Sequence, residues 1–260
     1  MGHTRIGKLH PTKNWKDLIA CFQVGAKYPQ FAHQVLEAVS DGLNERKLIE
    51  DAGYQKSVEL LVEMAIGAQR KDFIGHMREM GIDLSDNPTP QELIAKVANA
   101  IEEAAWAGGR VKTDLAEFSK KALSNTLTRV FHDEKSGFFS QEFQPSDLTI
   151  LGRFGKKELI IDMNRYFISQ TMAHALNAYI SMVLPNLAGD DARICSIHEL
   201  KGAYDSIATH CYELSLVHVD YSTDWLGKHE YQLCDMSERI KKKHGAFLVE
   251  KMMRALKAYE

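Results

Sequence analysis

Cysteine and histidine side chains in the C-terminal half have the residue types of a zinc site, because thiolates and imidazoles are the usual ligands of zinc. Two residues separate Cys195 from His198, and His218 is a third candidate ligand. No second pair with matching spacing accompanies them. His210 and Cys211 are adjacent, so on a helix their side chains would point about 100° apart. We therefore predict no cofactor, and keep as an alternative a helical metal-binding protein that uses Cys195, His198 and His218.

A second group of residues that could do chemistry is the basic segment Arg239-Ile-Lys-Lys-Lys-His244. It resembles the Arg-x4-6-His element of HEPN ribonucleases, which are helical proteins. The resemblance covers six residues and implies that His244 assists deprotonation of a ribose 2′-hydroxyl while Arg239 holds the scissile phosphate. A metal-independent ribonuclease of this kind is one alternative function. The other interpretation of the segment is a basic helix face in which Lys241 to Lys243 are solvated.

The short motifs of several common enzyme classes are absent from the sequence. It contains no HExxH zinc-hydrolase motif and no Glu three residues before a His, as a di-iron helical bundle needs. A GxxxxGK[ST] phosphate loop and a GxSxG nucleophile elbow are also missing. We therefore expect a non-catalytic role.

Composition limits the environment and the partners of the chain. Lys plus Arg (32) nearly balances Asp plus Glu (35), so nucleic acid could be bound only through a local basic patch. The cysteines, Cys21, Cys195, Cys211 and Cys234, lie far apart, which favours reduced thiols over a disulfide framework. No signal peptide or membrane-spanning run is recognisable. These features predict a cytoplasmic protein with no membrane contact.

Helical periodicity and helix caps run through most of the chain, and no convincing strand is found. An apolar repeat begins at about Gln55, and a short helix from Asp72 to Met80 precedes Gly81. Thr89 and Glu92 have the spacing of a capping box, with Pro90 at the first helical position. Thr113 is expected to cap a further helix that extends to about Phe131. The predicted fold is all-α, a multi-helix, bundle-like body.

Two long helices are predicted in the C-terminal half, over residues 156–184 and 197–226. The first has apolar residues on several sides, which predicts a central, largely buried helix. The second has one stripe at alternating steps of four and three. The stripe consists of Leu200, Tyr204, Ile207, Cys211, Leu214, His218, Tyr221 and Trp225. His218 is the polar position that interrupts this stripe of packing residues. If it is buried without a partner, a bound ligand or a subunit contact is the better explanation.

The predicted organisation has four parts: an extended basic arm (1–13), an N-terminal helical region (14–131), an aromatic-rich loop or linker (132–155) and a C-terminal long-helix region (156–260). The two helical regions are expected to pack as one body. The arm and the loop are the candidate partner-binding segments. Their candidate residues are Arg5, Lys8, Lys13, Phe138, Phe139 and Phe143. We therefore expect a helical interaction protein, a subunit or adaptor of a multi-protein assembly whose partners are other protein subunits.

Overall fold

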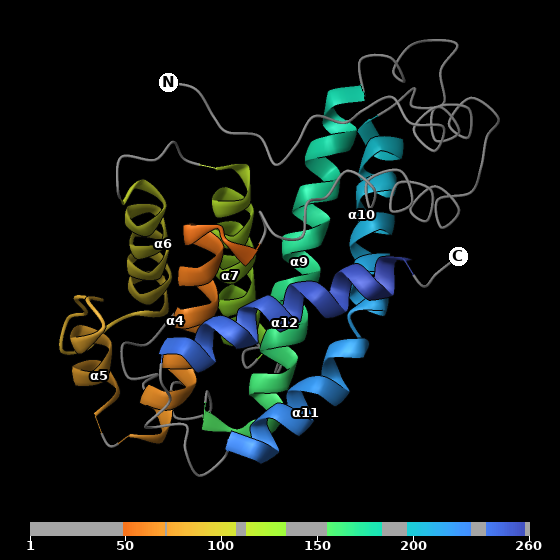
Figure 1. Cartoon of the computed structure of the whole chain (residues 1–260). Helices are drawn as coiled ribbons and strands as arrows, with labels where there is room; N and C mark the ends of the chain where they lie inside the picture. Colours follow the sequence, from red (N-terminus) through yellow and green to blue (C-terminus); the bar gives the residue numbers. More distant parts are fainter. Residues whose placement is uncertain are drawn as a thin grey trace.

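The computed structural model describes residues 49–70, 72–107, 113–133, 155–183, 197–229 and 238–257. This part of the chain is almost entirely helical and contains no strand, which confirms the all-α fold class (Figure 1). The helices are α4 (Ala52–Gln69), α5 (Phe73–Glu79), α6 (Pro90–Trp106), α7 (Asp114–Asp133), α9 (Lys157–Val183), α10 (Ile197–Leu214), α11 (Val217–His229) and α12 (Glu238–Lys257).

The helix α9 is the element around which the others are arranged (Figure 1). It packs against α4, α7, α10, α11 and α12. Apolar residues on several of its sides are buried because it is covered from several directions. These residues are Ile160, Met163, Phe167, Ile168, Met172, Leu176 and Ile180. Most of them belong to one core that also includes residues of α4, α6, α7, α10 and α12.

The second long helix predicted from the sequence is interrupted, so the prediction of two long helices is not confirmed. α10 ends at Leu214 and α11 begins at Val217. Between them, the Leu216 amide donates to the Glu213 carbonyl at 3.1 Å and not to the carbonyl of Tyr212, four residues before it. The Tyr212 carbonyl instead accepts from Arg165 Nη2 of α9 at 3.1 Å and from Ser215 Oγ at 2.6 Å. A contact from another helix therefore takes the acceptor that a continuous helix would use.

The N-termini of α4 and α7 are joined through their capping residues. Asp51 Oδ1 accepts from the Tyr54 amide at 2.9 Å, and its Oδ2 accepts from the Thr113 hydroxyl. Thr113 Oγ1 in turn accepts from the Ala116 amide at 3.0 Å, so Thr113 caps α7 as predicted. Gly53 lies against Ala116 and has no room for a Cβ. One carboxylate thus stabilises two helix ends at a close crossing.

The predicted capping box at the start of α6 is half correct. Thr89 Oγ1 accepts from the Glu92 amide at 3.1 Å, as expected of the capping residue. The Glu92 carboxylate does not return to Thr89; it accepts from the amide and the hydroxyl of Ser85, each at 2.7 Å. Those two bonds lower the pKa of Glu92. Glu92 therefore fastens the preceding loop onto α6.

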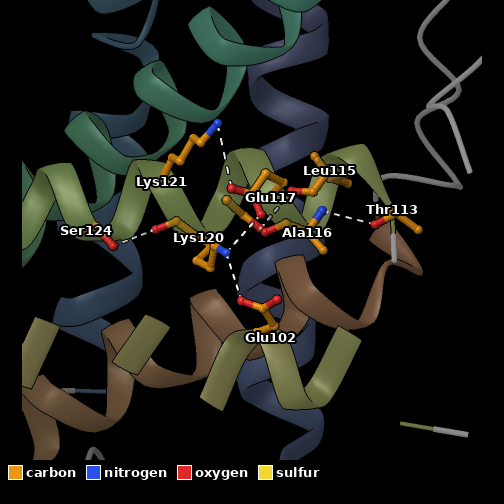
Figure 2. A network of polar contacts seen from close by, with 9 residues as sticks. Glu102, Thr113, Leu115, Ala116, Glu117, Lys120, Lys121 and Ser124 are labelled. Atoms are coloured by element: carbon orange, nitrogen blue, oxygen red, sulfur yellow. Dashed lines mark hydrogen bonds and ion pairs between the residues drawn. The ribbon is translucent and has the colours of Figure 1, made fainter. Parts of the chain in front are cut away.

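A polar network at the surface ties α6 to α7 (Figure 2). Lys120 Nζ lies 3.0 Å from Glu102 of α6 and 2.9 Å from Glu117 one turn earlier in α7. Glu117 also pairs with Lys121 at 3.7 Å. Because these groups are partly exposed, the network orients the two helices and adds little stability.

The C-terminal helix α12 crosses the body in front of α9 and reaches α4 (Figure 1). Contact is close at Gly245, where a Cβ would lie 3.3 Å from Val58 Cγ1. The Tyr54 hydroxyl donates to the Gly245 carbonyl at 2.9 Å. A glycine at this position lets the two backbones approach and makes that hydrogen bond possible.

Among the residues that the structure describes, no helix is long and apolar enough to cross a membrane. The predicted arm (1–13) and nearly all of the predicted loop (132–155) lie outside these residues. The proposed division into regions therefore stays a prediction.

We predict that Asp51→Ala lowers the free energy of unfolding by about 2 kcal/mol, because it removes a cap from α4 and a partner from Thr113. Asp72→Ala is the matched control. Asp72 caps only the short helix α5, accepting from the Gly75 amide at 2.7 Å in an exposed position. Urea unfolding of both variants measures the difference. Equal losses in the two variants would contradict the double role of Asp51.

Candidate functional site

Three ionisable side chains are buried together where α4, α5 and α12 meet. Glu63 of α4 lies 2.8 Å from His76 Nε2 of α5 and also forms an ion pair with Lys241 Nζ of α12. Their exposed fractions are 2% for Glu63, 6% for His76 and 7% for Lys241. The expectation that Lys241 is solvated is therefore wrong, because its ammonium group neutralises a carboxylate inside the protein.

His76 connects this buried charge cluster to an exposed carboxylate. His76 Nδ1 lies 3.9 Å from the exposed Glu79, which also pairs with Arg70 at 3.5 Å. On the other side of the imidazole, a Cβ at Gly67 would approach His76 Cδ2 to 2.8 Å, so the ring is held against the α4 backbone. The cluster is built to hold three helices together, with its charges compensated inside the protein.

His244, the candidate catalytic base of the ribonuclease alternative, is fully buried (0% exposed). Its ring stacks on Trp225 at 4.0 Å between centroids and on Tyr221 at 5.7 Å. Tyr221 Oη lies 3.3 Å from His244 Nδ1, and burial raises the pKa of that phenol. A ribose could reach His244 only if these aromatic rings separated. The Arg239 side chain lies outside the described residues.

His218 is buried at 0% exposure, and neither of its ring nitrogens has a hydrogen-bond partner in the described part of the chain. Burial lowers the pKa of His218 to about 4, and the cation Lys251 acts in the same direction. The Ser222 hydroxyl, four residues later, is also buried and has no partner among the described residues. The same is true of both amide atoms of Asn164 in α9. His218 is therefore buried without a partner among the described residues, which is the case in which we expect a bound ligand or a subunit contact.

Of the candidate zinc ligands, the structure describes only His198 and His218, which lie in different surroundings. His198 is exposed near the start of α10, whereas His218 is in the interior, and Cys195 lies outside the described residues. Within the described ranges, no group of three or more His, Cys, Asp or Glu side chains has the arrangement of a metal site.

A half-buried cluster of arginines and tyrosines lies where α7, α9 and α10 meet. Arg165 lies over the Tyr212 ring at 3.9 Å, and Arg129 lies over Tyr166 at 4.5 Å and over Tyr212 at 5.7 Å. The two tyrosine rings meet edge to face at 6.2 Å. We call these four residues the Arg–Tyr patch. Leu216, the residue at the helix break, flanks it and is 57% exposed.

The patch is rigid because its members are held by further contacts. Arg165 Nε donates to Ser215 Oγ at 3.2 Å, in addition to the bond from Nη2 to the Tyr212 carbonyl. Arg129 pairs with Asp162 at 3.4 Å. Guanidinium groups fixed over aromatic rings lose little conformational entropy when a partner binds. The arrangement can therefore bind an anionic or aromatic group without chemical reaction.

No local signal in the sequence predicts the buried charge cluster or the Arg–Tyr patch. Glu63 and Lys241 come from opposite ends of the described chain. Arg165 of α9 contacts Tyr212 of the next helix, α10. The predicted partner-binding residues Arg5, Lys8, Lys13, Phe138, Phe139 and Phe143 lie outside the described residues. Their role stays a prediction.

Comparison of the chain with protein-family models, curated proteins and solved structures gives no match in any of the three. Function is therefore inferred from the geometry of the chain itself.

We predict that Lys241→Met lowers the free energy of unfolding by about 3–5 kcal/mol, because it leaves Glu63 buried without its ammonium partner. Lys243→Met, two residues away and exposed, is expected to change it by less than about 0.5 kcal/mol. The double variant Glu63→Gln/Lys241→Met should recover part of the loss. Chemical unfolding of all three variants at pH 7 checks this, and similar effects of Lys241→Met and Lys243→Met would show that the ion pair contributes little.

We also predict that His218 makes the fold sensitive to acid. In the folded state its pKa is about 4, whereas the ordinary value is 6.5. Between these values the unfolded chain binds a proton that the folded chain does not, so this contribution to stability is complete above pH 6.5 and is lost as the pH falls towards 4. His218→Leu should reduce the loss of unfolding free energy between pH 7 and pH 5 by about 2 kcal/mol. Parallel pH profiles for wild type and variant, measured in urea, would contradict this assignment.

Proposed function

We propose that the protein is a non-catalytic helical interaction protein, a subunit or adaptor that contacts another protein through the Arg–Tyr patch and Leu216. The observation that carries this proposal is the patch itself: two arginines and two tyrosines in mutual contact beside an exposed leucine. Tyrosine and arginine are enriched among the residues that dominate binding energy at protein interfaces.

The chemistry of the patch favours a partner with an acidic segment. Among the described residues, Arg165 has no carboxylate partner, since its hydrogen bonds go to the Ser215 hydroxyl and the Tyr212 carbonyl. Its guanidinium is therefore a fixed cation that retains donors for a carboxylate. Leu216 supplies an adjacent apolar contact. A partner that presents a carboxylate next to an apolar side chain would complement both features.

Histidine, lysine and cysteine side chains react chemically in many enzymes. Three such side chains of this protein are used in packing instead, which supports a non-catalytic role. His244 is enclosed by aromatic rings, Lys241 is paired with Glu63, and Cys211 is a buried free thiol. Burial raises the pKa of Cys211 to about 12, so its thiol stays protonated at neutral pH. A free thiol is also compatible with the reducing cytoplasm in which we place the protein.

We expect Leu216→Glu to abolish capture of a stoichiometric partner from the native cells, with a fall in yield of about tenfold or more. The control is Trp106→Glu, which changes the other large exposed apolar side chain of the described residues (45% exposed, at the end of α6) and should leave capture unchanged. Cross-linking followed by quantitative mass spectrometry measures the yield, and circular dichroism confirms that both variants fold.

Two results would contradict the proposal. Equal capture by wild type and Leu216→Glu would remove the patch from the interface. Loss of capture in Trp106→Glu alone would place the interface on α6. If Leu216→Glu acts as expected, Arg165→Gln tests the acidic partner, because it removes the cation while keeping hydrogen-bond donors.

A further inference from the structure

Three buried polar side chains on α9 and α11 have hydrogen-bonding atoms without partners among the described residues. The unpartnered atoms are the amide nitrogen and oxygen of Asn164, the two ring nitrogens of His218 and the hydroxyl oxygen of Ser222. The exposed fractions of these three residues are 1%, 0% and 0%. Other buried hydroxyls on nearby helices behave differently: Thr171 of α9 donates to the Phe167 carbonyl at 2.9 Å. Native proteins leave few buried polar atoms unpaired, so this group requires an explanation.

The order of contacts along α9 and α11 places the three side chains in the same stretch of the structure. Ile160 of α9 belongs to the same packed cluster as Trp225 and Leu226 of α11. Further along α9, Arg165 contacts Ser215, which precedes α11. The two helices therefore run in opposite directions, and the chain between Ser215 and Leu226 passes the stretch of α9 between Ile160 and Arg165.

Asn164 lies between Ile160 and Arg165 on α9, and Ser222 and His218 lie between Leu226 and Ser215 on the segment that passes it. Residues four apart lie on the same face of a helix, so Asn164 continues the face of Ile160, and Ser222 and His218 continue the face of Leu226. Because α9 and α11 pack against each other, these positions place the polar side chains along that contact, next to the apolar cluster.

We propose that Asn164, His218 and Ser222 form a buried binding site for a small, uncharged, hydrogen-bonding molecule held between α9 and α11. The amide, the imidazole and the hydroxyl together offer both donors and acceptors. Since His218 is neutral at pH 7, the site presents no charge of its own. The ligand is either ordered water or a small organic molecule with hydroxyl or amide groups. Water commonly fills such a position by bonding to about three buried polar groups.

The surroundings favour an uncharged ligand over an ion. Lys251 of α12 is the charged group that acts on His218, and no described carboxylate acts on it. A metal cation would be repelled by that ammonium group and would find one imidazole without a carboxylate or thiolate. The site is separate from the Arg–Tyr patch, and its existence does not depend on the proposed function.

The site is tested by whether one substitution raises or lowers the melting temperature. Ser222→Ala removes one hydroxyl oxygen and leaves the helix backbone unchanged. If that oxygen bonds to a ligand, the melting temperature falls; if it is unpaired, removing it raises the melting temperature, because a buried desolvated group is lost. Ser57→Ala and Ser119→Ala are matched controls. Both serines are fully buried on helices, and their hydroxyls donate to backbone carbonyls of their own helix at 2.8 Å and 2.9 Å.

We expect Ser222→Ala to lower the melting temperature by about 3 °C relative to the wild type, a fall similar to or larger than that of the two controls, which also lose a satisfied hydrogen bond. A melting temperature equal to or above that of the wild type would overturn the proposal. The source of the ligand is then read from the intact wild-type protein. A small molecule released on denaturation and seen by mass spectrometry identifies an organic ligand. Nuclear Overhauser contacts between water and the His218 ring, with no released molecule, identify ordered water; if neither signal is found, the site does not exist.

Discussion

The bond from the Arg165 guanidinium to the Tyr212 carbonyl decides the arrangement of the C-terminal half. It takes the acceptor that the Leu216 amide would use, and the chain turns there instead of continuing as one helix. The turn directs α11 back along α9 and onto α12. It also leaves Leu216 exposed and fixes Arg165 over the Tyr212 ring. The Arg–Tyr patch and the exposed Leu216 both lie at this contact.

Several ionisable residues of the described chain join helices. Glu63 holds α5 through His76 and α12 through Lys241, and Asp51 joins the N-termini of α4 and α7. Buried ion pairs contribute less to stability than their Coulomb energy suggests, because desolvation is costly. Their effect is to specify one arrangement, since any other leaves a charge unpaired. This gives a structural role to residues whose types alone suggest catalysis, His76 and Lys241 among them.

The candidate site was only partly visible in the sequence. The stripe on the second predicted helix correctly indicated inward-facing positions, and His218 stood out because it is a polar residue in that stripe. Its lack of a partner could not be seen, because hydrogen bonding depends on the neighbouring helices. The pattern from Arg239 to His244 predicts a solvated basic face or a nuclease element. In the structure, Lys241 meets Glu63 and His244 meets Trp225, neither of which the local sequence contains.

The sequence by itself determined that the described chain is helical and where several helices begin, because periodicity and capping are local properties. Thr113 caps α7 and Thr89 caps α6 for that reason. Tertiary structure alone decided where the second predicted long helix breaks, where the Glu92 carboxylate bonds and which lysine of the basic segment is buried. In each case a residue distant in the sequence, or in a preceding loop, competes for a backbone or side-chain group. Such competition depends on distances in space that a linear pattern does not contain.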